Sequence, residues 1–319
     1  MANDSPISLA VELGPLRLKN PVMVASGTFG YGQEYGALVP PEMLGGVVVK
    51  GISLEPRAGN PPPRIWETCG GMLNSIGLQN VGLRGFLQEK LPYLRPLQVP
   101  VIVNLFGNTV EEYGELAAGL DGHEGIDALE INISCPNVKA GGMAFGSDPH
   151  MVFQVVSAVR SRTKLPVITK LTPNVTDITS PARAAEDAGT DILSLINTVA
   201  GMAVDARTRR PRLANVVGGL SGPAIKPIAL RMVWQVIRAS SVPVIGLGGI
   251  VSVEDALEFL IVGAKAIQVG TATFVNPQIT LEIISGLEDY LRRQGLRDIN
   301  QIIGTLEAPM EPLNTTQED

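Results

Sequence analysis

A short stretch with a cysteine at its centre carries the residues best suited to chemistry. Residues 129–146 read LEINISCPNVKAGGMAFG, and apolar and polar side chains alternate in the first half, which is the period of a strand. Pro136 ends such a strand because it has no N–H to donate, and the glycines after it predict a loop. Asn132, Ser134 and Cys135 are therefore expected at the C-terminal end of a strand, where parallel α/β folds place their chemistry.

Cys135 is the best candidate for moving a proton. A free thiol has a pKa of about 8.5, so a few per cent is thiolate at neutral pH, and a polar loop can raise that share. A buried, inert cysteine is the more common alternative, but the proline and glycines beside Cys135 place it on a loop. Cys69 lies outside any predicted strand end and is interpreted as structural. His123 and His150 fall in a helix–strand connection and at a helix start, away from the expected site.

Two lysines, Lys50 and Lys170, stand at the ends of predicted strands that are apolar on both faces. Burying an unpaired ammonium is expensive, so each needs an anionic or electron-rich partner unless it reaches water from the rim. Polar residues close other predicted strands as well, which favours one shared site. These residues are Ser26, Asn104, Asn132, Asn197 and Thr198.

Glycines follow the last two predicted strands. Gly246-Leu247-Gly248-Gly249-Ile250 comes after the seventh strand and Gly270-Thr271 after the eighth. Tight turns also use glycine, but in barrels a phosphate commonly binds between these two loops, on exposed backbone N–H groups. A phosphorylated cofactor anchored there would extend its ring towards the lysines, and FMN fits that geometry. A cation such as Lys170 would then stabilise the reduced ring at its N1–O2 edge.

Composition and charge argue against several classes of protein. The 319-residue chain is 45% hydrophobic, which is normal for a packed core, and no apolar run approaches the roughly 20 residues that cross a bilayer. A net charge of −6 and a pI near 5.1 provide no basic footprint for nucleic acid or an anionic membrane. Two cysteines and two histidines argue against a disulfide framework and a usual zinc site, so no metal is expected. The first residues do not resemble a signal peptide, and we expect a cytoplasmic protein.

The elements that must position these residues form a repeating pattern. Eight short strand-like segments alternate with helical patterns, which indicates a parallel sheet with right-handed crossovers. Eight such units predict a closed (β/α)8 barrel, the TIM barrel, rather than an open doubly wound sheet, which would need fewer strands. The predicted strands are 22–26, 47–50, 101–104, 128–134, 167–171, 192–196, 244–248 and 266–270, and the predicted helices include 110–120, 151–162, 180–188, 227–239, 253–262 and 278–294.

Other segments are additions to the barrel. Residues 7–21 predict a β-hairpin that turns at Gly14-Pro15 and covers the barrel floor. The connections 51–80 and 197–222 are longer than a barrel requires, and long insertions at the C-terminal face are usually lids or binding loops. We expect a single domain over residues 1–304, followed by a disordered acidic tail over residues 305–319.

Eight longer motifs are spread along the chain, namely LKNPVMVASGTFG, GNPPPR, MLNSIGLQN, NISCPNVKAGG, INTVAGM, GGLSGPAIKPIALRMV, GLGGI and VGTA. With these motifs the chain resembles the class 1 dihydroorotate dehydrogenases, and within them class 1B most closely. The resemblance covers nearly the whole chain. NISCPNV and NSIGLQN together are highly specific, whereas GGI or GT alone would be weak.

The resemblance implies roles for individual residues. Cys135 matches the catalytic base. The residues that match the FMN contacts of the family are Ser26, Lys50, Gly51, Asn104, Asn132, Lys170, Ile196, Gly222, Gly248, Gly249, Gly270 and Thr271. The residues that match its orotate contacts are Lys50, Asn74, Ser75, Ile76, Gly77, Leu78, Asn132, Asn197 and Thr198.

The activity implied by the resemblance is oxidation of dihydroorotate to orotate in pyrimidine biosynthesis. Cys135 would remove the C5 proton while the C6 hydrogen passes as hydride to N5 of FMN. Class 1B implies a homodimer joined by an iron–sulfur and FAD subunit in a heterotetramer that reduces NAD. Because two cysteines cannot hold an iron–sulfur cluster through four thiolates, that cluster would sit on the partner.

Other functions remain open from the sequence. A fumarate-dependent class 1A enzyme and the related domain of dihydropyrimidine dehydrogenases are the nearest alternatives. A flavin-free barrel acting on a sugar phosphate, as a lyase or an isomerase, comes from a different class, and a non-catalytic binding barrel is the remaining one. Flavin content and reduction of the flavin by dihydroorotate separate these possibilities.

Overall fold

Eight apolar segments of the chain form a closed parallel barrel. In the computed structural model, which describes residues 6–133 and 145–307, neighbouring strands of the barrel follow one another in the chain and the eighth pairs with the first. Each predicted strand overlaps one of them, which confirms the TIM barrel. The strands are β3 (Val22–Val24), β4 (Gly46–Val48), β7 (Val101–Leu105), β8 (Ala128–Asn132), β9 (Val167–Lys170), β10 (Ile192–Leu195), β15 (Val244–Leu247) and β16 (Ala266–Val269).

Most of the strands end earlier than predicted. Ser26, Lys50 and Ile196 follow β3, β4 and β10, respectively, instead of ending them. The N–H of Lys50 donates to the carbonyl of Gly30, outside the barrel ladder, because the backbone is already turning into the loop. These three residues therefore belong to the barrel mouth, where loops leave the C-terminal ends of the strands.

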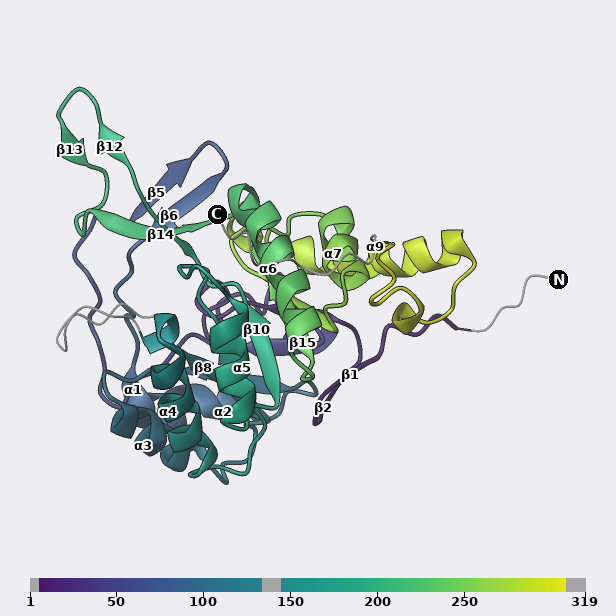
Figure 1. Cartoon of the computed structure of the whole chain (residues 1–319), viewed down its shortest axis with the longest axis horizontal. Helices are drawn as coiled ribbons and strands as arrows, with labels where there is room; N and C mark the ends of the chain where they lie inside the picture. Colours follow the sequence, from purple (N-terminus) through teal and green to yellow (C-terminus); the bar gives the residue numbers. More distant parts are fainter. Residues whose placement is uncertain (1–5, 134–144, 308–319) are drawn as a thin grey trace, which may run out of the picture.

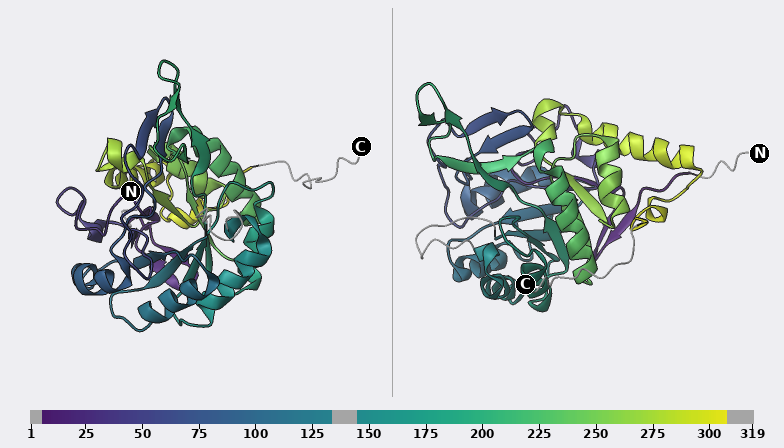
Figure 2. Two further views of the ribbon diagram at one scale, coloured as in Figure 1. Left: turned by 90° about the vertical axis from the view of Figure 1, so that its left-hand side faces the viewer. Right: turned by 45° about the horizontal axis from the view of Figure 1, so that its top comes forward.

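Helices surround the strands, as Figure 2 shows in its left view. All six predicted helices are present, with ends within two residues of the prediction, and the side chains of Thr109, Asp148 and Ser252 cap three of them by accepting a backbone N–H. The six are α3 (Val110–Leu120), α4 (Pro149–Arg160), α5 (Thr179–Asp187), α6 (Lys226–Ala239), α7 (Val253–Ile261) and α9 (Ile279–Gln294). Shorter helical pieces are η1 (Pro41–Met43), α1 (Gly82–Gly85), the π-turn η2 (Phe86–Lys90), α2 (Leu91–Leu94), η3 (Phe145–Ser147), η4 (Pro223–Ile225), α8 (Ala272–Val275) and η5 (Ile299–Gln301).

The predicted N-terminal hairpin is present at the floor of the barrel. Strands β1 (Val11–Leu13) and β2 (Leu16–Leu18) pair in antiparallel register around Gly14. Gly14 has a φ of +57°, and a Cβ there would lie 3.3 Å from the carbonyl oxygen of Asp191. Because Asp191 immediately precedes β10, the hairpin turn lies against the N-terminal ends of the strands, opposite the barrel mouth.

The two long insertions meet in a second sheet. Strands β5 (Ile65–Thr68) and β6 (Gly71–Asn74) come from the first insertion, and β11 (Val199–Met202) and β14 (Val217–Ser221) from the second. They pair antiparallel in the order β11-β14-β6-β5, beyond one end of the barrel in Figure 1. A small hairpin, β12 (Val204–Asp205) and β13 (Arg210–Pro211), projects from this sheet. The two insertions are therefore joined to each other by strand pairing.

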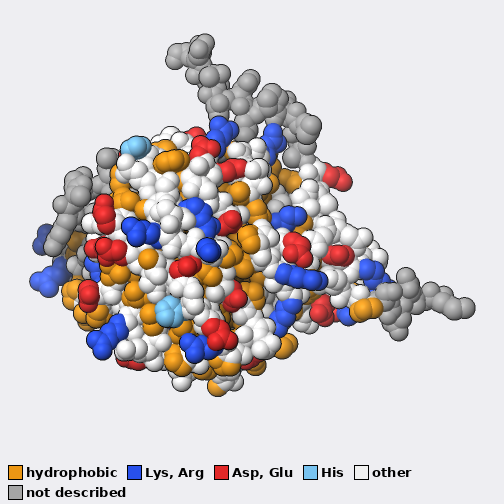
Figure 3. Space-filling view, turned by 90° about the horizontal axis from the view of Figure 1, so that it is seen from below, with side chains coloured by type: hydrophobic (Ala, Val, Ile, Leu, Met, Phe, Trp, Pro, Cys, Tyr) orange, Lys and Arg blue, Asp and Glu red, His pale blue; other side chains and the backbone are white. Residues whose placement is uncertain are grey.

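On the face shown in Figure 3, side chains of both charges are interspersed rather than gathered by sign. In the part of the chain that the structure describes, no helix has both the length and the apolar character needed to span a bilayer.

The N–H of Leu306 donates to the carbonyl of Ile261, so the first residues of the predicted tail pack on α7, and residues 308–319 lie outside the described part.

Candidate active site

The strand register brings the predicted polar residues to one end of the barrel interior. Asn132 pairs with Lys170 across β8 and β9, and Lys170 pairs with Ser194 across β9 and β10. Paired residues of parallel strands point to the same face, and side chains two residues apart share it. Asn104 donates to Glu130, which places it in the same interior. The mouth of the barrel therefore has a polar lining, as the sequence predicted.

Lys170 is buried and has an anionic partner. Its side chain is 5% exposed, with Nζ 3.7 Å from the nearer carboxylate oxygen of Glu130 and 3.4 Å from Oγ of Ser26. The expectation of an anionic partner is confirmed for this lysine. The alternative in which Lys170 reaches water from the rim is wrong, because its ammonium lies among barrel side chains.

Glu130 belongs to the same cluster of polar side chains and was not among the site residues predicted from the sequence. It is fully buried in β8 and accepts hydrogen bonds from Nδ2 of Asn104 (2.7 Å), Oγ of Ser194 (2.9 Å) and Nε2 of Gln268 (2.9 Å). The signal was present, since an acidic residue alternates with Leu129 and Ile131 in a strand that must be buried on both faces. A carboxylate in such a strand needs donors inside the barrel.

Lys50 lies in a different environment from Lys170. It is partly buried, and among residues 6–133 and 145–307 its ammonium makes no ion pair. Burial lowers the pKa of Lys50 from its ordinary value, the positive charge of Arg64 lowers it further, and the carboxylate of Glu34 acts in the opposite direction. An anionic ligand at this lysine would supply the missing partner.

The predicted substrate loop follows β6 and is held by backbone contacts. The N–H of Ser75 donates to the carbonyl of Arg64, and the carbonyl of Ile76 accepts from Asn60. Gly77 and Leu78 both have positive φ, of 75° and 57°, and the Oγ of Ser75 is buried without a hydrogen-bond partner in the described part of the chain. The loop thus has a fixed, turned backbone and one unsatisfied polar atom.

Two asparagines connect the barrel to the second insertion. Nδ2 of Asn197 donates to Oδ1 of Asn132 at 3.2 Å, and Oδ1 of Asn197 accepts from the N–H of Thr198 at 2.7 Å. Asn74, at the end of β6, donates to the carbonyl of Gly219 in β14. The three predicted amide side chains are therefore placed by the strands and by the second sheet, although Asn74 is turned towards its neighbouring strand.

Glycines from three loops form a cradle at the same end of the barrel. A Cβ on Gly249 would lie 2.9 Å from the carbonyl oxygen of Gly222, and a Cβ on Gly248 would lie 2.7 Å from Cβ of Ala229. Oγ1 of Thr271 donates to Oγ of Ser221 at 2.7 Å, which joins the loop after β16 to the end of β14. Within residues 6–133 and 145–307, the N–H groups of Gly249 and Thr271 make no hydrogen bond. Free amides in a space closed to side chains suit a phosphate.

We expect Gly249→Ala to weaken FMN binding by at least about tenfold, a loss of about 1.4 kcal/mol. The added methyl would meet Lys226 at 2.8 Å, and φ at this position is +75°. The dissociation constant of FMN, measured by titrating the apoprotein, checks this. Gly295→Ala is the matched control, because φ is +69° there but nothing lies within 4 Å of the new Cβ. Equal FMN affinity in the two variants would exclude the cradle as the phosphate site.

The two cysteines and the two histidines singled out from the sequence have different outcomes. Cys135, together with Ser134, lies outside the described residues, so its role stays a prediction. Cys69 is exposed at the turn between β5 and β6, so its side chain does not pack in the core as a structural cysteine would. His123 and His150 are exposed, and His150 contacts Gln154 within α4. His123 precedes β8 and so lies towards the end of the barrel opposite the mouth, and His150 lies in the first turn of the outer helix α4.

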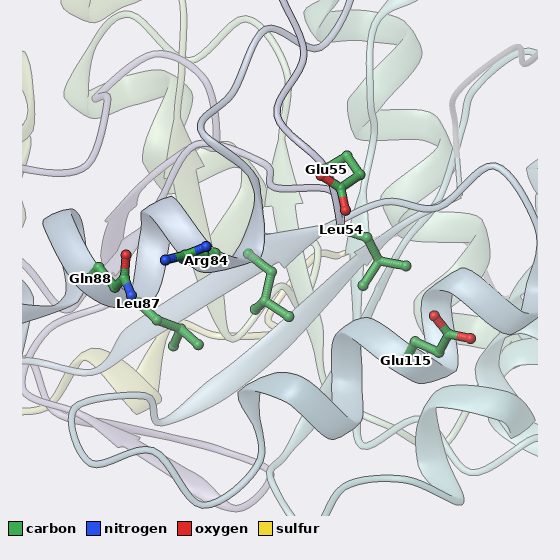
Figure 4. Close-up of a pocket in the computed structure, with 7 residues that line it drawn as sticks. Leu54, Glu55, Arg84, Leu87, Gln88 and Glu115 are labelled. Atoms are coloured by element: carbon green, nitrogen blue, oxygen red, sulfur yellow. The ribbon is translucent and has the colours of Figure 1, made fainter.

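A pocket on the outer wall of the barrel is separate from these residues. It has a volume of about 430 Å³ and lies where the segment after β4 passes α1, η2 and α3, as Figure 4 shows. None of the predicted site residues lines it. Its lining consists of Leu54, Glu55, Leu83, Arg84, Leu87, Gln88 and Glu115. The chemistry therefore places the candidate site at the barrel mouth and not in this pocket.

Comparison with known proteins decides the family. The sequence model of the family described as dihydroorotate dehydrogenase matches residues 8–291, which includes every barrel strand and the second sheet. The chain belongs to the dihydroorotate dehydrogenase family. The resemblance seen in the motifs is thereby confirmed.

Close relatives within this family carry one name. The chain is 60% identical over 301 residues to the "Dihydroorotate dehydrogenase B (NAD(+)), catalytic subunit" of Trichlorobacter lovleyi, covering 94% of this chain and 99% of the relative. It is 59% identical over 298 residues to the protein of that name from Desulforamulus reducens, covering 93% and 98%. It is 58% identical over 300 residues to that of Geobacter metallireducens, covering 94% and 98%. The similarity thus extends over nearly the full length of both proteins in each pair.

Proposed function

We propose that this chain is the catalytic subunit of an NAD-linked dihydroorotate dehydrogenase and oxidises dihydroorotate to orotate in pyrimidine biosynthesis. The proposal rests on one observation: Lys170, Asn104 and Asn132 lie at the same end of the barrel as the glycine cradle. The names of the relatives, which are 58–60% identical to this chain, support the same assignment.

FMN is the cofactor that these residues fit, in keeping with a family of flavoenzymes. The free N–H groups of Gly249 and Thr271 would hold its phosphate, and Lys170 would bring positive charge to the ring. When bound, FMN supplies the acceptor for the hydride that leaves C6 of dihydroorotate. The proposed contacts are Ser26, Lys50, Gly51, Asn104, Asn132, Lys170, Ile196, Gly222, Gly248, Gly249, Gly270 and Thr271.

The substrate is proposed to bind between the barrel and the loop after β6. Asparagine amides both donate and accept hydrogen bonds, which suits the alternating N–H and C=O groups of a pyrimidine ring. Lys50 would pair with the substrate carboxylate, since it makes no ion pair within the described residues. The proposed contacts are Lys50, Asn74, Ser75, Ile76, Gly77, Leu78, Asn132, Asn197 and Thr198.

Cys135 is proposed to take the proton from C5 of dihydroorotate. The thiolate accepts this proton, the electrons of the C5–H bond form the C5=C6 double bond, and the C6 hydrogen departs with its electron pair. The adjacent C4 carbonyl makes the C5 proton acidic, so a base of moderate strength is sufficient. A thiol meets that need near neutral pH.

A partner subunit is proposed to carry the electrons to NAD. The relatives are named as catalytic subunits, which implies a second kind of subunit in those proteins. With two cysteines, this chain cannot supply the four thiolates of an iron–sulfur cluster. We therefore assign the cluster and FAD to a partner that joins a homodimer of this chain in a heterotetramer. Co-purification from the native cell would recover that flavoprotein, and isolation of this chain alone with full NAD-dependent activity would contradict it.

The substrate assignment is tested by the absorption spectrum of the FMN-loaded protein. Orotate is expected to shift the flavin bands, and uracil, which lacks the carboxylate, is not. A shift with uracil alone would favour a dihydropyrimidine dehydrogenase. A protein that stays colourless after incubation with FMN would favour a flavin-free barrel instead.

The affinity for orotate is expected to fall as pH rises through the lowered pKa of Lys50. Below that pKa the ammonium pairs with the orotate carboxylate, and above it the attraction is lost. Arg64→Gln should move this fall to higher pH, because it removes a repelling charge, and Glu34→Gln should move it to lower pH. Orotate titrations from about pH 6 to about pH 10 measure the shift. A fall at the same pH in all three proteins would show that Lys50 does not govern binding.

A further inference from the structure

Glu130 is an unusual residue for its place in the fold. The interiors of (β/α)8 barrels are filled mainly with bulky apolar side chains, yet this carboxylate is 0% exposed inside the barrel. Burying an ionised carboxylate is costly unless it is paired and hydrogen-bonded. The proposed reaction uses Lys170 and Asn104 but assigns no role to the acid beneath them.

The hydrogen bonds of Glu130 fix the direction of its neighbours. An ionised carboxylate only accepts, so each neighbour must turn a donor towards it. Nδ2 of Asn104 donates to it at 2.7 Å, which turns the amide oxygen of Asn104 away from Glu130. That Oδ1 faces Gly51 just beyond β4, where a Cβ would lie 2.5 Å from it. Glu130 therefore makes Asn104 present an acceptor to the barrel mouth.

The contact between Glu130 and Lys170 has a different character. At 3.7 Å it is longer than a hydrogen bond, whose usual N···O distance is about 2.9–3.0 Å, and the contact of Lys170 with Ser26 is also long, at 3.4 Å. The carboxylate thus balances the charge of the buried ammonium while leaving its N–H bonds able to donate to a ligand.

We propose that Glu130 is a positioning residue of the cofactor site, which balances the positive charge of Lys170 and turns Asn104 so that both present the correct groups to FMN. This inference rests on the proposed binding of FMN. It predicts that a large part of the effect of Glu130 on FMN affinity depends on Lys170, whereas a purely structural carboxylate would act independently of that lysine.

A double-mutant cycle on FMN affinity tests the proposal. The four proteins are the wild type, E130Q, K170M and E130Q/K170M, and the readout is the dissociation constant of FMN from fluorescence titration of each apoprotein. E130Q is expected to weaken FMN binding about 10–100-fold. This loss corresponds to the usual contribution of a hydrogen bond that involves a charged group. In the K170M background the same change should weaken binding several-fold less than it does in the wild type, because only the effect through Asn104 remains. Ser194→Ala, which removes one donor and keeps the carboxylate, serves as the control and should stay within about threefold of the wild type.

Each outcome decides between the alternatives. Equal weakening by E130Q in both backgrounds, or binding by E130Q at the wild-type level, would overturn the proposal. Folding of the double variant when a single variant fails to fold would support it, since the two side chains then depend on each other. Failure of the double variant to fold would contradict it. Absence of FMN binding by the wild type would instead refute the proposed function.

Discussion

Replacing Cys135 with alanine is expected to slow reduction of the bound flavin by dihydroorotate by about 10²–10⁴-fold, the usual contribution of a general base. FMN should remain bound, because the proposed phosphate and ring contacts come from other loops. Without the thiolate, the C5 proton has no positioned acceptor, and hydride departure from C6 leaves the ring without its stabilising double bond. Anaerobic stopped-flow absorbance in a single turnover measures the rate directly.

Cys69→Ala is the matched control for that experiment. This thiol is exposed at the turn between β5 and β6, so its removal should change neither the rate nor the colour. Undiminished flavin reduction in Cys135→Ala would show that another group is the base. Equal slowing in both variants would point to a general effect of removing a thiol.

Replacing Lys170 with alanine is expected to reduce both stability and cofactor binding. The free energy of unfolding should fall by about 3–5 kcal/mol, because Glu130 would be left as an uncompensated charge in the barrel interior. FMN affinity should fall by at least about tenfold, since a charged donor to the ring is lost. Urea unfolding of the apoprotein and FMN titration separate the two effects.

An exposed ion pair provides the comparison. Arg17 and Glu12 lie 3.5 Å apart with side chains 79% and 74% exposed, and such pairs contribute less than about 1 kcal/mol. Arg17→Ala should therefore unfold almost as the wild type does. Stability and FMN affinity of Lys170→Ala that match those of Arg17→Ala would remove the role assigned to the buried lysine.

The barrel was predictable because its signals are local. Each strand is a short apolar run, and helices such as α3 and α7 begin at a Thr109 or Ser252 cap that the sequence displays. The segment 82–94 was not predicted, because a π-turn separates two four-residue helices and breaks the 3.6-residue period. Local pattern therefore predicts elements well where the period is regular.

The site was predictable in its parts but not in its connections. Lys170 was identified as a buried cation, and an acid in a buried strand was visible at Glu130, but their pairing was not, because the facing of β8 towards the barrel interior depends on closure by all eight strands. Likewise, Asn74 pairs in register with Gly219, far along the chain, so the second sheet has no local signal. The sequence therefore predicted the two long insertions but not the sheet that joins them.

The central claim is that this chain removes two hydrogen atoms from dihydroorotate and passes the electrons to a flavin held at the barrel mouth. Anaerobic addition of dihydroorotate to the FMN-loaded protein, followed by visible absorbance, tests it most directly. We predict rapid bleaching of the flavin with stoichiometric formation of orotate, and no bleaching with dihydrouracil. A flavin that stays oxidised in the presence of excess dihydroorotate would contradict the account.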